Sequence, residues 1–131
     1  MTVQDAIVAA ERVLPGNAAA EGELDPRWQA VIKVGEFIEN DPDAVWQFAA
    51  RWGCNADEDL RSAIATCLVE HLLEYHFEKV FPRIESLARS DKFFARTVAM
   101  CWKFGETEQP VNAERFEQLL RELKEERDRW P

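Results

Sequence analysis

The stretch DPRWQAVIKVG at residues 25–35 matches two later stretches, EDLRSAIATCL at 58–68 and KFFARTVAMCW at 92–102, at a step of 33 to 34 residues. In this register Val31, Ile64 and Val98 coincide, and each stretch has apolar residues at helical spacing. A second stretch with the same spacing follows each of them. A step of this length is typical of stacked helical hairpins, because one hairpin buries its apolar face only against a neighbour.

Capping residues and helix breakers predict where the helices begin and end. Thr2 caps a first helix that stops at Pro15-Gly16, and residues 15–24 form a connector. Asp-Pro pairs open the next two helices, Asp57 opens the fourth, and Ser90 or Asp91 opens the sixth. Pro82 predicts either a bend in the fifth helix or a late start of it near Phe81. Asn112 caps the last. After the connector we expect helices at 26–39, 42–52, 57–75, 77–89, 91–104 and 113–129.

The predicted fold is all-α, because the sequence has no sustained alternation of apolar and polar residues and no Asn-Gly turn. We expect one domain over residues 1–131, in which 1–24 supply a helix and a connector and 25–130 supply three hairpins. The hairpins pair 26–39 with 42–52, 57–75 with 77–89, and 91–104 with 113–129. The arrangement is a short right-handed α-solenoid of about seven helices.

The composition predicts a soluble cytoplasmic protein. Hydrophobic residues make up 47% of the 131, which is enough for one core, and no apolar run reaches the roughly 20 residues of a membrane span. We see no basic region followed by an apolar run at the start, and so expect no secretory signal.

The cysteines and tryptophans are predicted to be mostly core residues. The three cysteines have no CxxC spacing, and Cys67 and Cys101 fall on apolar helix faces as reduced thiols. We place Trp28, Trp46, Trp52 and Trp102 in the core, and expect Trp130 to be exposed or folded back.

The net charge of −9 lies mostly in the first half, where residues 1–60 have 12 acidic and 4 basic side chains. A nucleic-acid-binding surface needs a basic patch, so this half repels phosphate backbones. It attracts a basic partner instead. We therefore expect a basic protein partner, no nucleic acid and no membrane, and leave the oligomeric state open.

Three related patterns resemble the first helix of HEAT-like or armadillo-like repeats: Asp25-Pro26-x-Trp28-x-Ala30-Val31, Glu58-x-x-Arg61-x-Ala63-Ile64 and Lys92-x-x-Ala95-x-Thr97-Val98. The resemblance covers about residues 25–130. It implies a surface that binds another macromolecule, usually a protein. The chain departs from a regular array in its first helix, in the long connector 105–112 and at Pro82. The basic groove of the DNA-binding, alkylpurine-excising HEAT-like proteins has no counterpart here.

The densest group of reactive side chains comprises Cys67, Glu70, His71, Glu74 and His76. The pattern His71-x-x-Glu74-x-His76 has one residue more than the inverted zincin motif, and that residue turns His76 about 100° away on a helix. We expect no catalytic residue, no metal and no cofactor. Two alternatives stay open: a metal-dependent enzyme that uses the histidines with Glu70 and Glu74, and a nucleic-acid-binding HEAT-like module that uses Arg83, Arg89, Lys92 and Arg96.

The acidic side chains near two helix junctions are the predicted partner-binding site. Capping explains some of them, but not Glu36 and Glu39. If equivalent turns align along one edge of the stack, these groups form one negative ridge. The predicted ridge comprises Glu36, Glu39, Asp41, Asp43, Asp57, Glu58 and Asp59. The predicted function is a non-catalytic protein–protein interaction module, in its most concrete form an immunity or antitoxin-like protein that blocks a basic toxic nuclease.

Overall fold

The computed structural model describes residues 1–128, and within this range it contains helices and no strand, which confirms the all-α prediction. The elements are α1 (Val3–Val13), α2 (Pro26–Gly35), α3 (Pro42–Trp52), α4 (Glu58–Ile64), the π-helical η1 (Ala65–Val69), α5 (Glu70–Ser90), α6 (Lys92–Ala99), the 3-10 helix η2 (Gly105–Glu108) and α7 (Pro110–Asp128). Trp130 and the last residue of the predicted helix 113–129 lie outside the described residues.

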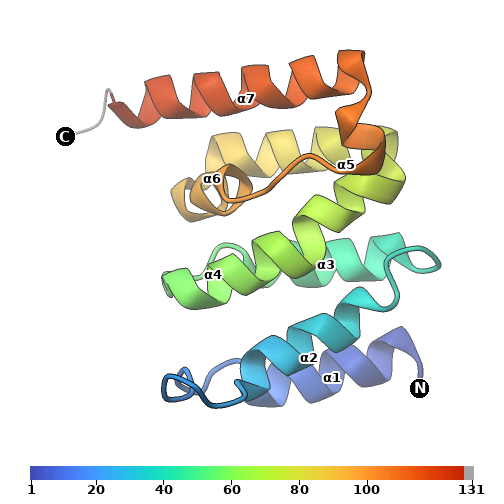
Figure 1. Cartoon of the computed structure of the whole chain (residues 1–131), viewed down its shortest axis with the longest axis vertical. Coiled ribbons are helices and arrows are strands. Elements are labelled where there is room, and N and C mark those ends of the chain that lie inside the picture. The colour runs from blue at the N-terminus through green and yellow to red at the C-terminus, as the bar shows by residue number, and fades with distance from the viewer. Residues whose placement is uncertain (129–131) are drawn as a thin grey trace.

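The helices form two rows along the long axis of the molecule (Figure 1). In one row α2 packs on α4 and α4 on α6, while in the other α1 packs on α3, α3 on α5 and α5 on α7. Helix α2 also packs closely on α1, so the predicted hairpin 26–39/42–52 is not its main contact. Each row therefore takes every second helix, and α1, which matched no repeat in the sequence, occupies the end of the second row.

The register of the three matching stretches places equivalent residues in the core. Val31, Ile64 and Val98 are all fully buried. The side chains of Asp25, Asp57 and Asp91 each accept a hydrogen bond from the backbone N–H two residues later, so the helices of this row begin alike. The second row has its own spacing of 35 residues, at which Ala10, Val45 and Val80 are likewise fully buried.

A bend at His76 divides the longest run of helix. Helices α4, η1 and α5 follow one another without a loop, and His76 has non-helical angles, with φ of −139° and ψ of 44°. Its Nε2 donates a hydrogen bond to the Ile38 carbonyl at 2.9 Å. Pro82, where the sequence predicted a bend, lies exposed within the following helical segment. The bend allows one run of helix to contribute to both rows.

Several local predictions are wrong. Asn112 does not cap the last helix: α7 begins at Pro110, and the buried Asn112 amide donates to the Glu106 carbonyl at 2.9 Å. Asp41 precedes α3 but forms no capping hydrogen bond. Helix α6 ends at Ala99 rather than 104, so Trp102 lies in an extended segment with 73% of its surface exposed instead of in the core.

Arg27 joins α2 to the first turn of α4 and to the connector between α1 and α2. Its side chain is only 3% exposed, and its two terminal nitrogens lie 2.9 Å from Asp57 Oδ2 and 3.0 Å from Asp59 Oδ2. It also donates to the carbonyl of Gly16. A guanidinium fork reaches two carboxylates and a carbonyl at once, which a single ammonium cannot do as well. The start of α2 is thereby fixed against the first turn of α4.

We expect Arg27→Lys to lower the free energy of unfolding by about 1–2 kcal/mol, because one of the two carboxylate contacts and the fork geometry are lost. The matched control is Arg51→Lys, at an exposed arginine that pairs with Glu11, and its expected effect is within about 0.5 kcal/mol. Urea unfolding followed by circular dichroism measures both. Equal effects at the two positions would contradict the role given to Arg27.

Candidate functional site

The predicted acidic residues lie in two groups at opposite ends of α2. Glu36 and Glu39 follow its C-terminal end, whereas Asp57 and Asp59 bind Arg27 near its N-terminal end. A helix of 10 residues separates the groups by about 15 Å. The turn between α2 and α3 and the start of α4 accordingly lie on opposite sides of the molecule (Figure 1). The single continuous ridge is therefore wrong, because consecutive turns alternate between the two ends of the helices.

Some of these carboxylates are already neutralised by the chain itself. Asp43 lies 3.2 Å from Lys79 Nζ and 2.9 Å from an Arg83 nitrogen, and the hydrogen bond from Arg83 is the main reason that its pKa is lowered. The hydrogen bond from Arg27 lowers the pKa of Asp57 in the same way. Asp59 shares the Arg27 contact and also accepts from the Trp28 indole N–H. These aspartates hold helices together and have little charge left for a partner.

The remaining predicted residues are exposed and form no ion pair within residues 1–128. Glu36, Glu39 and Asp41 lie together, at the end of α2 and in the turn that follows it, while Glu58 lies apart in the first turn of α4. Among the predicted residues, the unpaired negative charge is thus concentrated at one end of α2.

Beside this charge lies a groove of about 420 Å³ between α2 and the run α4–η1–α5. We call it the acidic groove, and its walls include Ile32, Glu36, Glu39, Cys67, His71 and Tyr75. The helices approach closely at Gly35, where a Cβ atom would lie 3.1 Å from the Cys67 carbonyl oxygen. Ile32 and Tyr75 leave 43% and 45% of their surface exposed, so the groove combines carboxylates with apolar surface.

His71 lines the acidic groove and also contacts Phe104, an aromatic residue outside it. Its ring stacks on Phe104, with 5.7 Å between centroids and 14° between planes, and its Nδ1 lies 2.7 Å from Glu74 Oε1. Gly105 holds this segment against α5 in a left-handed conformation, with φ of 53°, where a Cβ would lie 2.6 Å from Glu74 Cγ. The exposed Trp102 belongs to the same segment, so apolar surface continues beyond the groove.

The geometry gives little support to the catalytic and metal-binding alternatives. Among residues 1–128 no three His, Cys, Asp or Glu side chains come together as metal ligands. His76 is bonded to Ile38, and Glu70 accepts a 2.9 Å hydrogen bond from the Trp102 backbone N–H. Burial raises the pKa of Cys67, which disfavours the thiolate that a nucleophile needs.

Of the four basic residues of the nucleic-acid alternative, Arg83 lies apart, whereas Arg89, Lys92 and Arg96 line one cavity at the end of α5 and along α6. Arg83 pairs with Asp43, and Arg89 pairs with Glu85 and Glu122. Lys92 and Arg96 lie on α6, where both contact the Phe93 ring through cation–π interactions.

Sequence reasoning missed the apolar walls of the acidic groove. Neither Ile32 nor Tyr75 was identified as an exposed residue, and Trp102, in the segment beyond the groove, was placed in the core. Ile32 lies on α2 next to the fully buried Val31, so its exposure depends on which face of α2 the neighbouring helices cover. The spacing of apolar residues does not decide which face that is, and the exposure of Trp102 depends in turn on where α6 ends.

Comparisons of the chain with protein-family models, curated proteins and solved structures found no match. No helix within residues 1–128 has the length and apolar character needed to cross a bilayer. The geometry of the acidic groove is therefore the basis for a functional conclusion.

Two carboxylates whose pKa values are shifted in opposite directions test the electrostatics of the fold. Burial raises the pKa of Glu70, so above the ordinary carboxyl range this group keeps its proton longer in the folded chain than in the unfolded chain. The free energy of unfolding therefore falls as the pH rises above that range. The lowered pKa of Asp43 has the opposite sign and adds stability as pH rises through that range. Between about pH 2 and 7 we expect Glu70→Gln to gain stability relative to the parent chain mainly above about pH 4. Asp43→Asn should lose stability relative to the parent chain mainly as the pH rises toward about 4, because the pKa of Asp43 is lowered.

Thermal unfolding over this pH range measures both slopes. In the Glu70→Gln protein the introduced amide oxygen can still accept from the Trp102 N–H, so the substitution isolates the charge. If the difference in stability between the Glu70→Gln protein and the parent chain stays constant with pH, then Glu70 has no desolvation penalty.

Proposed function

We propose that this chain is a non-catalytic protein-interaction module that binds a basic segment of another protein in the acidic groove. The carrying observation is that Glu36 and Glu39 form no ion pair within residues 1–128 and line the same groove as the exposed Ile32 and Tyr75. Carboxylates that serve solubility need no apolar neighbours. A partner with lysine or arginine next to an apolar side chain would satisfy both parts of the groove.

The stacking of alternate helices supports the further proposal that the fold is a short HEAT-like solenoid. The groove lies between α2 of the first row and the bent run α4–η1–α5, which contributes to both rows, so the packing of the rows itself creates the binding surface. In its most concrete form, the module is an immunity or antitoxin-like protein that covers a basic nuclease. The three free cysteines suit action in a reducing cytoplasm.

A pull-down from native cytosol at two salt concentrations tests the electrostatic part of this proposal. We expect a basic protein to be captured at about 0.05 M salt and largely released at about 0.5 M, because screening shortens the Debye length severalfold. The variant Glu36→Lys/Glu39→Lys should reduce capture about tenfold or more. The matched control, Glu21→Lys/Glu23→Lys, makes the same charge change in the exposed connector and should capture normally.

Capture that is insensitive to salt, or equally weakened by both double variants, would remove the acidic groove as the binding site. Far-ultraviolet circular dichroism of each variant separates loss of binding from loss of fold.

The apolar part of the groove is tested by Tyr75→Ala, which we expect to weaken binding of the captured partner about tenfold, as truncation of a central aromatic side chain does at many interfaces. The matched control is Leu24→Ala, at an exposed apolar residue of the connector. Isothermal titration with the purified partner measures both. Unchanged affinity in the Tyr75→Ala protein would mean that charge alone accounts for binding.

A further inference from the structure

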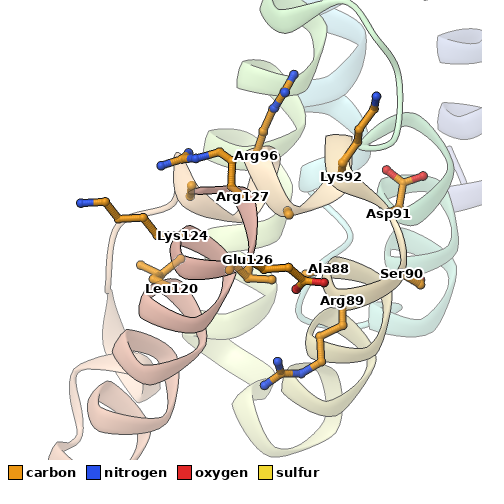
Figure 2. Close-up of a pocket in the computed structure, with 13 residues that line it drawn as sticks. Ala88, Arg89, Ser90, Asp91, Lys92, Arg96, Leu120, Lys124, Glu126 and Arg127 are labelled. Atoms are coloured by element: carbon orange, nitrogen blue, oxygen red, sulfur yellow. The ribbon is translucent and has the colours of Figure 1, made fainter. Parts of the chain in front are cut away.

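A second cavity, of about 450 Å³, lies between the end of α5, helix α6 and the C-terminal half of α7 (Figure 2). We call it the basic cleft. Its lining includes Arg89, Lys92, Arg96, Lys124 and Arg127 against two carboxylates, Asp91 and Glu126. This is an excess of positive charge in a chain whose net charge is −9.

Most of these cations have no internal partner. Arg89 is paired with Glu85 and Glu122, but Lys92, Arg96, Lys124 and Arg127 form no ion pair with any carboxylate in the described part of the chain. Of the two acidic residues, Asp91 is occupied with the backbone N–H groups of Phe93 and Phe94 at the start of α6. The cleft therefore gathers like charges that its own residues do not compensate.

The cations stand on both sides of the cleft. Lys92 and Arg96 project from α6, and Lys124 and Arg127 from α7, with Arg96 and Arg127 at the same rim (Figure 2). On the α6 side, Lys92 and Arg96 rest on the Phe93 ring, 5.4 Å and 5.6 Å from its centroid. This contact holds both cations without a carboxylate and leaves their charge available.

Small and aliphatic side chains lie between the two charged sides. They include Ala95 and Ala99 from α6 and Leu120 and Leu123 from α7. The alanines leave room for side chains of an incoming segment. A phosphate backbone would use the cations alone, whereas a helix with apolar side chains along one face and carboxylates on both flanks would use the cations and the apolar surface together.

We propose that the basic cleft is a second docking site, which takes an acidic amphipathic helix of a partner protein. Apolar side chains of that helix fill the space over Ala95, Ala99 and Leu120, while its flanking carboxylates meet Lys92 and Arg96 on one side and Lys124 and Arg127 on the other. This site shares no lining residue with the acidic groove, and its ligand has the opposite charge. The proposal stands independently of the function assigned to that groove.

The test uses a fluorescently labelled, helix-forming peptide with leucine at positions i, i+3, i+4 and i+7 and glutamate on both flanks. A scrambled peptide of the same composition and a single-stranded DNA oligonucleotide of equal charge serve as competitors. Fluorescence anisotropy at about 0.05 M salt follows binding to the full chain. We expect the amphipathic peptide to bind about tenfold more tightly than the scrambled one, because only the former presents one apolar face.

Charge reversal identifies the site. Arg96→Glu/Arg127→Glu should weaken peptide binding about tenfold or more, and Lys92→Glu/Lys124→Glu, as a second variant, should do the same. The matched control is Arg12→Glu/Lys33→Glu, which reverses two exposed cations of α1 and α2 and should change affinity less than about twofold. Circular dichroism verifies that each variant is folded.

Three results would overturn the proposal: no binding of the amphipathic peptide, equal binding of the amphipathic and scrambled peptides, or stronger binding of the oligonucleotide than of the amphipathic peptide. The last would identify the cleft as a nucleic-acid site. Equal losses in the cleft variants and the control would likewise overturn it, by showing that only the net charge of the chain matters.

Discussion

The fold depends on the burial of short apolar stripes between two rows of helices. Helices as short as α2, α4 and α6 are unstable alone in water. The free-energy cost of nucleating the first turn exceeds the stabilisation from the few hydrogen bonds that follow. These helices persist because Val31, Ile64 and Val98 are each removed completely from water by neighbours in both rows. Because the rows interlock, no helix pair is an independent unit. The bent run from α4 to α5 contributes to both rows and so connects the two ends of the molecule.

This packing also decides where charge can act. Consecutive turns lie at opposite ends of the helices, so acidic residues that are close in the sequence are separated in space. Those next to a neighbouring helix, such as Asp43 and Asp57, are neutralised by arginine and lysine from that helix. Carboxylates at the free end of α2 have no such neighbour. The basic cleft at α6 and α7 arises similarly, where two helices place cations around the rim of the same cavity.

The sequence predicted the helical class and the core register, because a 33- to 34-residue step and aspartate caps are local patterns with direct physical consequences. The register of the second row was not recognised, since only Val45 and Val80 are alike and the third member, Ala10, lies on a helix that matched no repeat. Of the candidate site, Glu36, Glu39 and Asp41 were identified from charge alone. Tyr75 and Ile32 were not, because exposure of an apolar residue depends on which face of its helix the neighbouring row leaves uncovered.

The most direct test of interlocked rows is native-state hydrogen exchange in the parent chain and the Ile64→Ala protein. Truncation of this buried side chain in the central run should cost about 2–5 kcal/mol. If the rows form one cooperative unit, protection of the α2 and α6 amides falls by the same free energy as that of α4. Loss of protection confined to α4, η1 and α5, with α2 and α6 unchanged, would contradict the account.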